Sequence, residues 1–183
     1  MDTDERLVML FQRDGDVGRL DELTRRHMPR TRAVVFQMVL NDADADDLVQ
    51  EIFVRAYRGL GTFRGSATFT TWLYRIVLNT TRSFLAARGR RSPVENETAA
   101  DPPDAAHRRP DARALDTEKW ERIEAAMGQL SPKLRAALTL VVLQDMPAPE
   151  AAGIEGCSTA TMYWRVYQAR KELGRSLAAY LET

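Results

Sequence analysis

The residues best suited to chemistry in this sequence are arginines that stand apart from any carboxylate. The 43 residues between Glu51 and Glu95 hold eight arginines and no Asp or Glu. Arg75, Asn79 and Arg82 stand four and three residues apart, so on a helix they share one ridge. Two guanidinium groups that flank an amide suit a groove that neutralises phosphates and reads one base edge. This arginine ridge predicts nucleic-acid binding, and a solvated basic face is the alternative.

A second candidate surface lies on the last helix that the sequence predicts. Met162, Val166, Ala169 and Leu173 recur at helical spacing and would face a core. The opposite side, here called the aromatic face, combines aromatic, amide and cationic side chains with one alanine: Ala160, Trp164, Tyr167, Gln168, Lys171 and Arg175. Burial under a further helix is the alternative, but the sequence offers no spare helix to cover this face. A binding face is therefore favoured.

The third surface belongs to a helix predicted over residues 46–60. Apolar residues at positions 48, 49, 52, 53, 56, 57 and 60 form an unbroken stripe. A rotation of about 100° per residue places the opposite side, here called the 47–58 face, away from that stripe. Its members are Asp47, Gln50, Glu51, Val54 and Arg58. A solvated charged surface is the default interpretation of this pattern.

Enzyme chemistry finds little support in the sequence. No P-loop, G-x-G-x-x-G, H-E-x-x-H or G-x-S-x-G motif is present. His27 and His107 have no candidate metal or triad partners nearby, and Cys157 fits a buried structural thiol better than a nucleophile. The sequence therefore predicts a protein without catalytic residues, metal or cofactor.

Composition indicates a soluble cytoplasmic protein with no membrane insertion. Hydrophobic residues make up 44% and charged residues 28% of the 183 residues, which is ordinary for globular domains. No apolar run approaches the roughly 18 residues of a membrane span, and the N-terminus is acidic where a signal peptide would be basic. The single cysteine excludes an internal disulfide and suggests a reducing compartment.

The elements that must position these side chains are all predicted to be helices. In the first half, a helix that carries Leu7 and Phe11 should end at Gly15, and Pro29 should break the apolar run that follows it. Asp44 is the expected N-cap of the helix that carries the 47–58 face. In the second half, Ser131 followed by Pro132 should begin one helix. Beyond it, a short weak segment, a Gly-containing turn and a long helix capped by Ser158 follow the order of a helix-turn-helix.

An acidic segment separates the two helical parts. Residues 92–116 hold four of the eight prolines, six alanines and only two large apolar residues, with three basic and six acidic side chains. Such a segment cannot bury a core and reads as a flexible linker. The predicted fold is therefore all-α, with small helical domains over residues 1–91 and 117–183, a linker over residues 92–116, and a helix-turn-helix in the second domain.

Two stretches resemble one family of transcription factors. The first, DADDLVQEIFVRAYRGLGTFRGSATFTTWLYRIVLNTTRSFL, is similar to the core-binding and minus-ten-reading part of extracytoplasmic-function (group 4) sigma factors, and to their envelope-stress branch in particular. The second, LSPKLRAALTLVVLQDMPAPEAAGIEGCSTATMYWRVYQARKEL, resembles their minus-thirty-five-reading helix-turn-helix. The resemblance implies an alternative sigma factor that binds the beta and beta-prime subunits of core RNA polymerase and directs it to promoter DNA. An anti-sigma factor is a further implied partner.

The resemblance also assigns roles to residues. Polymerase would contact the 47–58 face, with Asp47, Gln50, Glu51, Val54 and Arg58. The loop over residues 61–68 and the arginine ridge would take a base flipped from the minus-ten element, and the linker would run through the polymerase cleft. The minus-ten set comprises Arg64, Ser66, Phe69, Trp72, Arg75, Asn79 and Arg82. The minus-thirty-five set comprises Thr161, Tyr163, Trp164, Arg165, Tyr167, Gln168 and Lys171. Trp72 also lies in the apolar stripe of its own helix, which favours a core position.

The second stretch departs from the family pattern on both helices of its helix-turn-helix. The family usually has a basic residue at Tyr163, a small one at Trp164 and often a basic one at Gln168. The preceding helix normally has leucine at Glu155 and no proline at position 149, and Gly153 lowers its helix propensity further. These departures predict a changed base preference in a conserved fold.

Two other classes of protein compete with a sigma factor. One is a regulatory protein that keeps these surfaces but binds a protein partner, and an acid-free arginine stretch is not needed for that role. The other is a free-standing repressor, which would need a dimer interface, and no heptad run supplies one.

Overall fold

The computed structural model describes residues 2–91 and 114–181, and it confirms the all-α prediction. Within those two ranges every regular element is a helix. Residues 92–113, most of the expected linker, lie outside the described residues, and a helix begins at Ala114. None of the described helices is long and apolar enough to cross a membrane.

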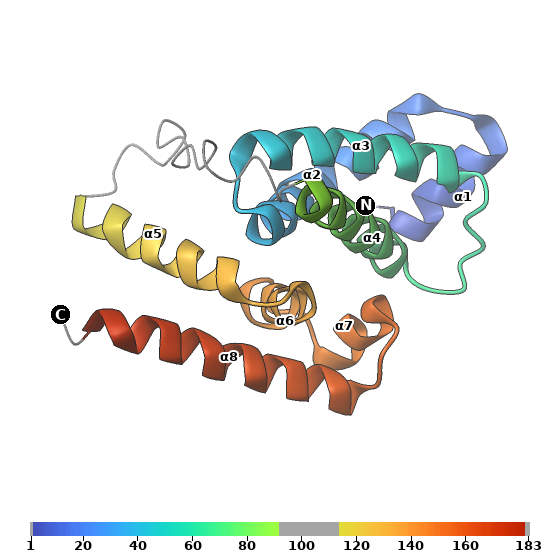
Figure 1. Ribbon diagram of the computed structural model, residues 1–183. Helices are drawn as coiled ribbons and strands as arrows, with labels where there is room; N and C mark the ends of the chain where they lie inside the picture. The colour runs from blue at the N-terminus through green and yellow to red at the C-terminus, as the bar shows by residue number, and fades with distance from the viewer. Residues whose placement is uncertain (1, 92–113, 182–183) are drawn as a thin grey trace.

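Four helices form the first domain (Figure 1): α1 (Asp4–Asp14), α2 (Val17–Val39), α3 (Asp42–Leu60) and α4 (Phe69–Arg91). The end of α1 is the predicted one, because Gly15 takes a left-handed conformation with φ 68° and donates its amide to the Phe11 carbonyl. Most of the apolar stripe of α3 is buried as predicted, with Leu48, Ile52 and Leu60 in the core, but Tyr57 at its edge is exposed.

Two local predictions in this domain are wrong. Pro29 does not break a helix, since α2 continues through it from Val17 to Val39. Residues buried on both sides of Pro29, such as Leu23 and Val34, hold α2 against its neighbours, so tertiary packing outweighs the missing hydrogen bond. The N-cap of α3 is Asn41 rather than Asp44, because the Asn41 side chain accepts a 2.9 Å hydrogen bond from the Asp44 amide.

The second domain contains α5 (Ala114–Gln129), α6 (Pro132–Leu138), the π-helical turn η2 (Thr139–Leu143), α7 (Ala148–Glu155) and α8 (Thr159–Leu181). Ser131 caps α6 as predicted, and the Ser158 hydroxyl accepts a 3.1 Å hydrogen bond from the Thr161 amide at the start of α8. Gly156 makes the turn between α7 and α8 with φ 63°. The pair α7 and α8 is therefore the expected helix-turn-helix.

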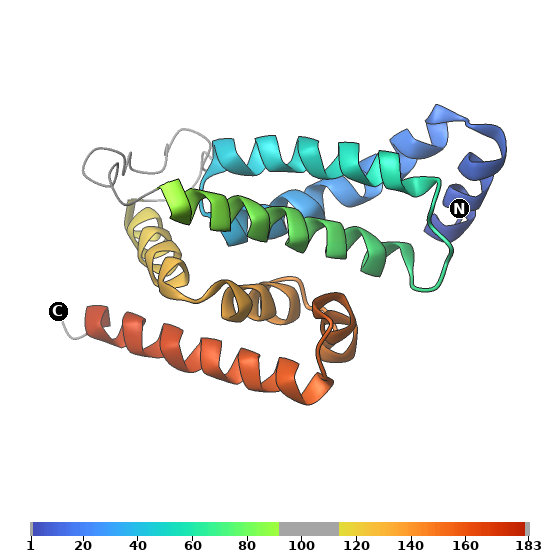
Figure 2. The same cartoon turned by 45° about the vertical axis from the view of Figure 1, so that its right-hand side comes forward.

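The two domains pack against each other. In both views of the ribbon, α4 lies between α3 and the second domain (Figures 1 and 2). Helix α4 contacts α7, and α2 contacts both α6 and η2. A single apolar core joins Val77 and Leu78 of α4 to Ala151 and Ile154 of α7. The linker composition could not show this, because the contact depends on faces contributed by both domains.

A buried arginine joins the two domains at a second point. Arg135 of α6 is 8% exposed, and its Nη1 donates a 2.6 Å hydrogen bond to the Met38 carbonyl at the end of α2. Its Nη2 donates to the carbonyls of Gly128 (2.6 Å) and Leu130 (3.2 Å). Burial lowers the pKa of Arg135 from its ordinary value. Arg135 therefore satisfies three carbonyl oxygens from two domains.

Candidate polymerase and nucleic-acid interfaces

All five residues of the 47–58 face are exposed on α3. Val54 is 47% exposed, and Tyr57 beside it is 55% exposed although the sequence pattern places it in the buried stripe. Glu51 accepts a 2.9 Å hydrogen bond from Nε of Arg55, one turn along the helix. Exposed apolar side chains among paired charges are more typical of a surface that binds a protein than of a solvated charged face.

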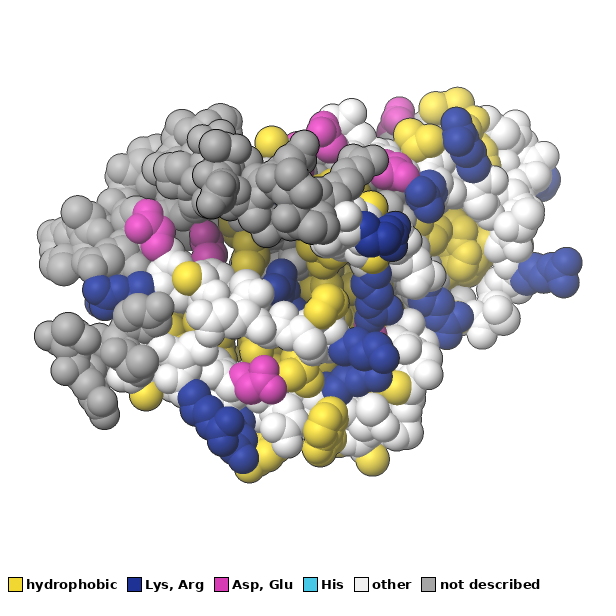
Figure 3. Space-filling view, viewed as in Figure 1, with side chains coloured by type: hydrophobic (Ala, Val, Ile, Leu, Met, Phe, Trp, Pro, Cys, Tyr) yellow, Lys and Arg dark blue, Asp and Glu magenta, His cyan; other side chains and the backbone are white. Residues whose placement is uncertain are grey.

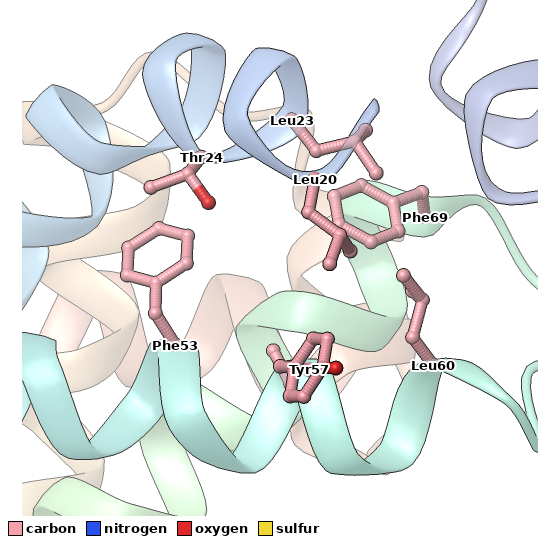
Figure 4. A pocket seen from close by; sticks show the side chains of 8 residues that line it. Leu20, Leu23, Thr24, Phe53, Tyr57, Leu60 and Phe69 are labelled. Carbon is pink, nitrogen blue, oxygen red and sulfur yellow. The ribbon is translucent and has the colours of Figure 1, made fainter. Parts of the chain in front are cut away.

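An apolar hollow of about 110 Å³ opens beside this face (Figure 4). It lies between α2 and α3, with Phe69 from the start of α4 at one end. Its lining is Leu20, Leu23, Thr24, Phe53, Ala56, Tyr57, Leu60 and Phe69. Because Tyr57 lines the hollow and is exposed, the hollow continues the apolar part of the α3 surface.

The loop between α3 and α4 is held by side chains from two helices. The amide of Gln12 in α1 donates 2.8 Å hydrogen bonds to the carbonyls of Leu60 and Phe63. The ring of Trp72 packs on Phe63 with ring centroids 5.5 Å apart. Gly59 leaves room for this ring, since a Cβ there would lie 3.1 Å from Trp72. The loop is therefore anchored at its base, where a preformed site needs rigidity.

The residues predicted to contact the minus-ten element in and beside the loop divide into exposed and buried ones. Arg64 and Ser66 are exposed, next to Gly65, which has a positive φ of 67°. Phe69 is 3% exposed and packs against Trp72, which is itself half-buried. Phe69 therefore positions the loop and does not reach its surface, and Trp72 has the core contacts that its stripe position predicts.

The arginine ridge lies on α4, and both of its arginines contact α7 of the second domain, although Arg75 stays exposed and the Arg82 side chain is 31% exposed. Nη2 of Arg75 donates a 2.8 Å hydrogen bond to the carbonyl of Gly153 in α7. Arg82 forms an ion pair with Glu155, also in α7. Asn79, between them, is exposed. The structure thus keeps the predicted ridge geometry while it occupies the guanidinium groups with protein partners.

Glu155 connects the arginine ridge to α8. Its side chain is 2% exposed, and its second carboxylate oxygen lies 2.9 Å from Nη1 of Arg165. Arg165 is therefore turned toward the domain contact, with a 14% exposed side chain, and is not part of the aromatic face. In the space-filling view, basic side chains gather over α4 and the adjoining edge of the second domain (Figure 3).

The aromatic face of α8 is open as predicted. Tyr163, Trp164 and Tyr167 are 60%, 58% and 60% exposed. Lys171 is also exposed, and Gln168 is half-buried beside these rings. Thr161 belongs to the cap of α8, because its hydroxyl lies 2.8 Å from that of Ser158. Among the described residues no helix covers the three rings, although large aromatic side chains tend to be buried in a monomer.

Three contacts of this region were not predicted from the sequence. They are the pairing of Glu155 with Arg82 and Arg165, the contacts of Arg135, and a 2.6 Å contact between Nε2 of His27 and Asp4. Each partner lies on another element, so no spacing rule connects them. One signal was available: Glu155 stands where the family normally has leucine, and a buried carboxylate requires a cationic partner.

Comparisons with known proteins identify the family of this chain. Residues 23–91 match the family described as Sigma-70 region 2, and residues 120–173 match Sigma-70, region 4. The RNA polymerase sigma-H factor of Pseudomonas aeruginosa is 36% identical over 188 residues, which cover 97% of this chain and 95% of that protein. The chain belongs to the extracytoplasmic-function (ECF) sigma factors.

Other relatives support the same family. The ECF RNA polymerase sigma-E factor of Escherichia coli strain K12 is 33% identical over 178 residues, which cover 93% of this chain and 92% of that protein. Among solved structures, CnrH in complex with the cytosolic domain of CnrY has a TM-score of 0.73 at 26% identity and covers 97% of this chain and 99% of its own. The expected family is thereby confirmed.

Membership in the sigma factors defines the general activity. The chain is an alternative sigma factor that directs transcription initiation, and it binds core RNA polymerase and promoter DNA. Sigma factors are initiation factors and not enzymes.

Proposed function

We propose that three surfaces of this sigma factor divide the work of promoter-specific initiation in the cytoplasm, with no catalytic activity or cofactor of its own. The first domain (residues 1–91) docks on polymerase and reads the minus-ten element, and the second (residues 117–183) reads the minus-thirty-five element. The observation that carries this assignment is the exposed aromatic face on the second helix of a helix-turn-helix. That helix is the one that enters the major groove in this motif.

The 47–58 face is the proposed polymerase surface, facing the beta and beta-prime subunits. Its support is physical: Gln50 and Val54 are exposed on α3 and lie outside the buried core, and the exposed Tyr57 lies beside them. The adjacent apolar hollow enlarges the surface that a partner could bury.

The loop over residues 61–68 and the arginine ridge are the proposed minus-ten site. Arg64 and Ser66 are exposed on an anchored loop, and Asn79 offers an amide donor and acceptor to an unstacked base. Arg75 and Arg82 would neutralise phosphates on either side of that base, and at Arg82 the phosphate would replace the carboxylate of Glu155.

The aromatic face is the proposed minus-thirty-five site. Gln168 suits the N6 and N7 edge of adenine, and Trp164 has a large apolar surface suited to a thymine methyl group or a sugar. Lys171 would contact phosphate and set the register. Arg165 can join it only after its ion pair with Glu155 is broken.

An anti-sigma factor is a proposed further partner. The similar protein CnrH was solved together with the cytosolic domain of CnrY. The exposed rings of α8 and the apolar hollow beside α3 are surfaces that a second protein could cover.

In vitro transcription from a random promoter library tests the proposed function. Core polymerase with this chain should select promoters that share a minus-ten and a minus-thirty-five element, and polymerase alone should select none. The competing class, a regulatory protein that binds only other proteins, predicts co-elution with a partner but no promoter-dependent transcripts. Transcripts without a shared minus-thirty-five element would contradict the role of the aromatic face.

A further inference from the structure

Helix α1 bonds to the backbone at both ends of the loop over residues 61–68, the loop of the proposed minus-ten site. At the start of the loop, Nε2 of Gln12 donates 2.8 Å hydrogen bonds to the carbonyls of Leu60 and Phe63. At its end, a carboxylate oxygen of Glu5 accepts a 2.9 Å hydrogen bond from the amide of Phe69. Two side chains of one helix therefore hold the two ends of the loop.

The groups that α1 bonds lie at helix termini. Leu60 ends α3 and Phe69 begins α4, and the last carbonyls and first amides of a helix have no partner inside that helix. Helix α4 has no Asp or Glu in its own first turn. Glu5 therefore supplies the carboxylate that is favoured at a helix N-terminus, and Gln12 supplies the donor that is favoured at a C-terminus.

The spacing of the two side chains lets α1 set the distance between the ends of the loop. Glu5 and Gln12 are seven residues apart, so they share one side of α1 and stand about 10 Å apart along its axis. Leu7 and Val8 between them are 6% and 1% exposed, which fixes α1 on the core of the first domain. A packed helix is a rigid spacer, whereas an eight-residue loop is not.

Helix α1 is also fixed to α2. The carboxylate of Asp4 lies 2.8 Å from Nη1 of Arg26 and 2.6 Å from Nε2 of His27. The ring of His27 packs edge-on against Phe69, with ring centroids 5.1 Å apart. The end of the loop is therefore held twice, by Glu5 at the Phe69 amide and by His27 at the Phe69 ring.

We propose that α1 sets the conformation of the minus-ten loop: Gln12 and Glu5 are positioning residues that hold its two ends, so that Arg64 and Ser66 present one base site. The inference deepens the proposed function, since it rests on this loop as part of the minus-ten site. Both residues act through the loop backbone and not by contact with DNA. When either contact is lost, the loop populates further conformations, and the apparent affinity for the preferred base falls with the fraction that remains competent.

This role predicts a loss of selectivity and not a general loss of binding. Contacts to phosphate fix the register of a protein on DNA and carry no sequence information, and those of Arg75 and Arg82 come from α4 and not from the loop. Contacts to the base depend on the loop conformation. Loss of a positioning residue should therefore relax one minus-ten position while the rest of the promoter is read as before.

Three variants test the two ends of the loop. Gln12→Glu keeps the shape of the side chain but replaces the amide donor with a carboxylate that would face two carbonyl oxygens. Glu5→Ala removes the acceptor of the Phe69 amide, and Glu5→Gln keeps an oxygen that can accept from it. The matched controls lie on α2: Gln37→Glu makes the same chemical change as the first variant, and Asp21→Ala removes a carboxylate from an exposed position.

The experiment selects promoters from a library randomised in both elements, with full-length chains bound to core polymerase. We expect Gln12→Glu and Glu5→Ala to reduce the preference for the selected base at one minus-ten position by about tenfold. Glu5→Gln should keep most of that preference because its amide oxygen replaces the carboxylate as acceptor. Minus-thirty-five selection and affinity for core polymerase should equal those of the wild type, as should every measurement on the two controls.

Hydrogen exchange of the Phe69 amide, followed by NMR in the free chain, tests the contact itself. Exchange should be faster in Glu5→Ala than in the wild type and in Glu5→Gln. If circular dichroism shows that Gln12→Glu does not fold, the pair of exposed Glu5 variants decides the question.

The outcomes separate this proposal from the proposed function. Wild-type base preference in a folded Gln12→Glu or Glu5→Ala holoenzyme overturns the proposal, and so does weaker initiation from all promoters without a change in base preference. An equal loss in Glu5→Ala and Glu5→Gln overturns the role of the hydrogen bond to Phe69. Failure of the wild-type holoenzyme to select any minus-ten element overturns the proposed function instead.

Discussion

The arginine ridge of α4 and the aromatic face of α8 are two polar surfaces on 23-residue helices, and they differ in what lies over them. On the ridge, Arg75 and Arg82 are occupied by Gly153 and Glu155 of α7. On the aromatic face, Trp164 and Tyr167 remain more than half exposed. The arginines of one surface are thus bonded to another helix of the same chain, whereas the rings of the other surface have no helix over them among the described residues.

The two candidate DNA surfaces therefore differ in their partners within the chain. The rings of the aromatic face are exposed, whereas Arg75 and Arg82 already donate to a carbonyl and a carboxylate oxygen of α7. A DNA phosphate bound at Arg82 would have to replace the carboxylate of Glu155, because the same donors bind both anions.

The largest expected effect concerns binding to core polymerase through the 47–58 face. Gln50→Lys together with Val54→Lys places two cations on the exposed 47–58 face, where Asp47 and Glu51 indicate a basic partner surface. Like-charge repulsion and the desolvation of a charge should weaken binding to core polymerase by about 1,000-fold, or about 4 kcal/mol. Binding is measured by competition with a labelled wild-type chain. The double variant should leave the arginine ridge and the aromatic face unchanged.

Val17→Lys is the matched control for this double variant. Val17 is 59% exposed on α2, away from the 47–58 face, so the same change should leave polymerase binding intact. Circular dichroism should show equal helicity in all three proteins. Unchanged affinity of the double variant would remove the 47–58 face from the polymerase interface.

The second prediction tests whether the domain that carries the arginine ridge and the domain that carries the aromatic face unfold as one cooperative unit. Arg135→Met leaves the carbonyls of Met38, Gly128 and Leu130 without their buried donor, which should cost about 3 kcal/mol of unfolding free energy. Urea denaturation should give one transition in the wild type and a lower midpoint in the variant. Lys133→Met, an exposed position on α6, should stay within about 0.5 kcal/mol. Two separate transitions in the wild type would mean that the domains unfold independently.

The same comparison separates what the sequence can predict from what it cannot. Gly15, Ser131 and Ser158 end or begin helices as predicted because each acts on backbone within a few residues of itself. The outward direction of Trp164 and Tyr167 also follows from local periodicity. These features need no knowledge of the rest of the chain.

Features that depend on contacts with a distant element were not predicted from the sequence. The continuity of α2 through Pro29 depends on packing at both of its ends, and the contacts of Arg135 reach from α6 to α2. The three ridge residues lie on α4 as predicted, but the partners of the two arginines come from a helix more than 70 residues away, with Arg82 and Glu155 separated by 73 positions. Helical periodicity gives the direction of a side chain and not the partner that it meets.

The third prediction concerns Asn79, the exposed amide between the two arginines of the ridge. Asn79→Ala removes an amide that can donate to and accept from one base, so it should cost about 1–3 kcal/mol in minus-ten recognition. Promoter selection by the holoenzyme should show relaxed preference at one minus-ten position and weaker initiation. Arg82→Ala should instead weaken binding to all sequences and reduce the salt dependence. Gln37→Ala on α2 is the control, and full selectivity in Asn79→Ala would refute base reading by the ridge.

The smallest expected effect concerns base recognition by the aromatic face of α8. Gln168 lies beside the exposed rings of Trp164 and Tyr167, and its amide suits the N6 and N7 edge of adenine, whereas arginine pairs with O6 and N7 of guanine. Gln168→Arg should therefore shift the preferred base at one minus-thirty-five position toward guanine, by about 1 kcal/mol. Selection of elements from a random library with wild-type and variant holoenzymes measures the shift. Gln37→Arg adds the same charge on α2, so it separates base reading from a general gain in affinity. If both holoenzymes select the same bases, Gln168 does not read DNA, and the exposed rings are left for a protein partner.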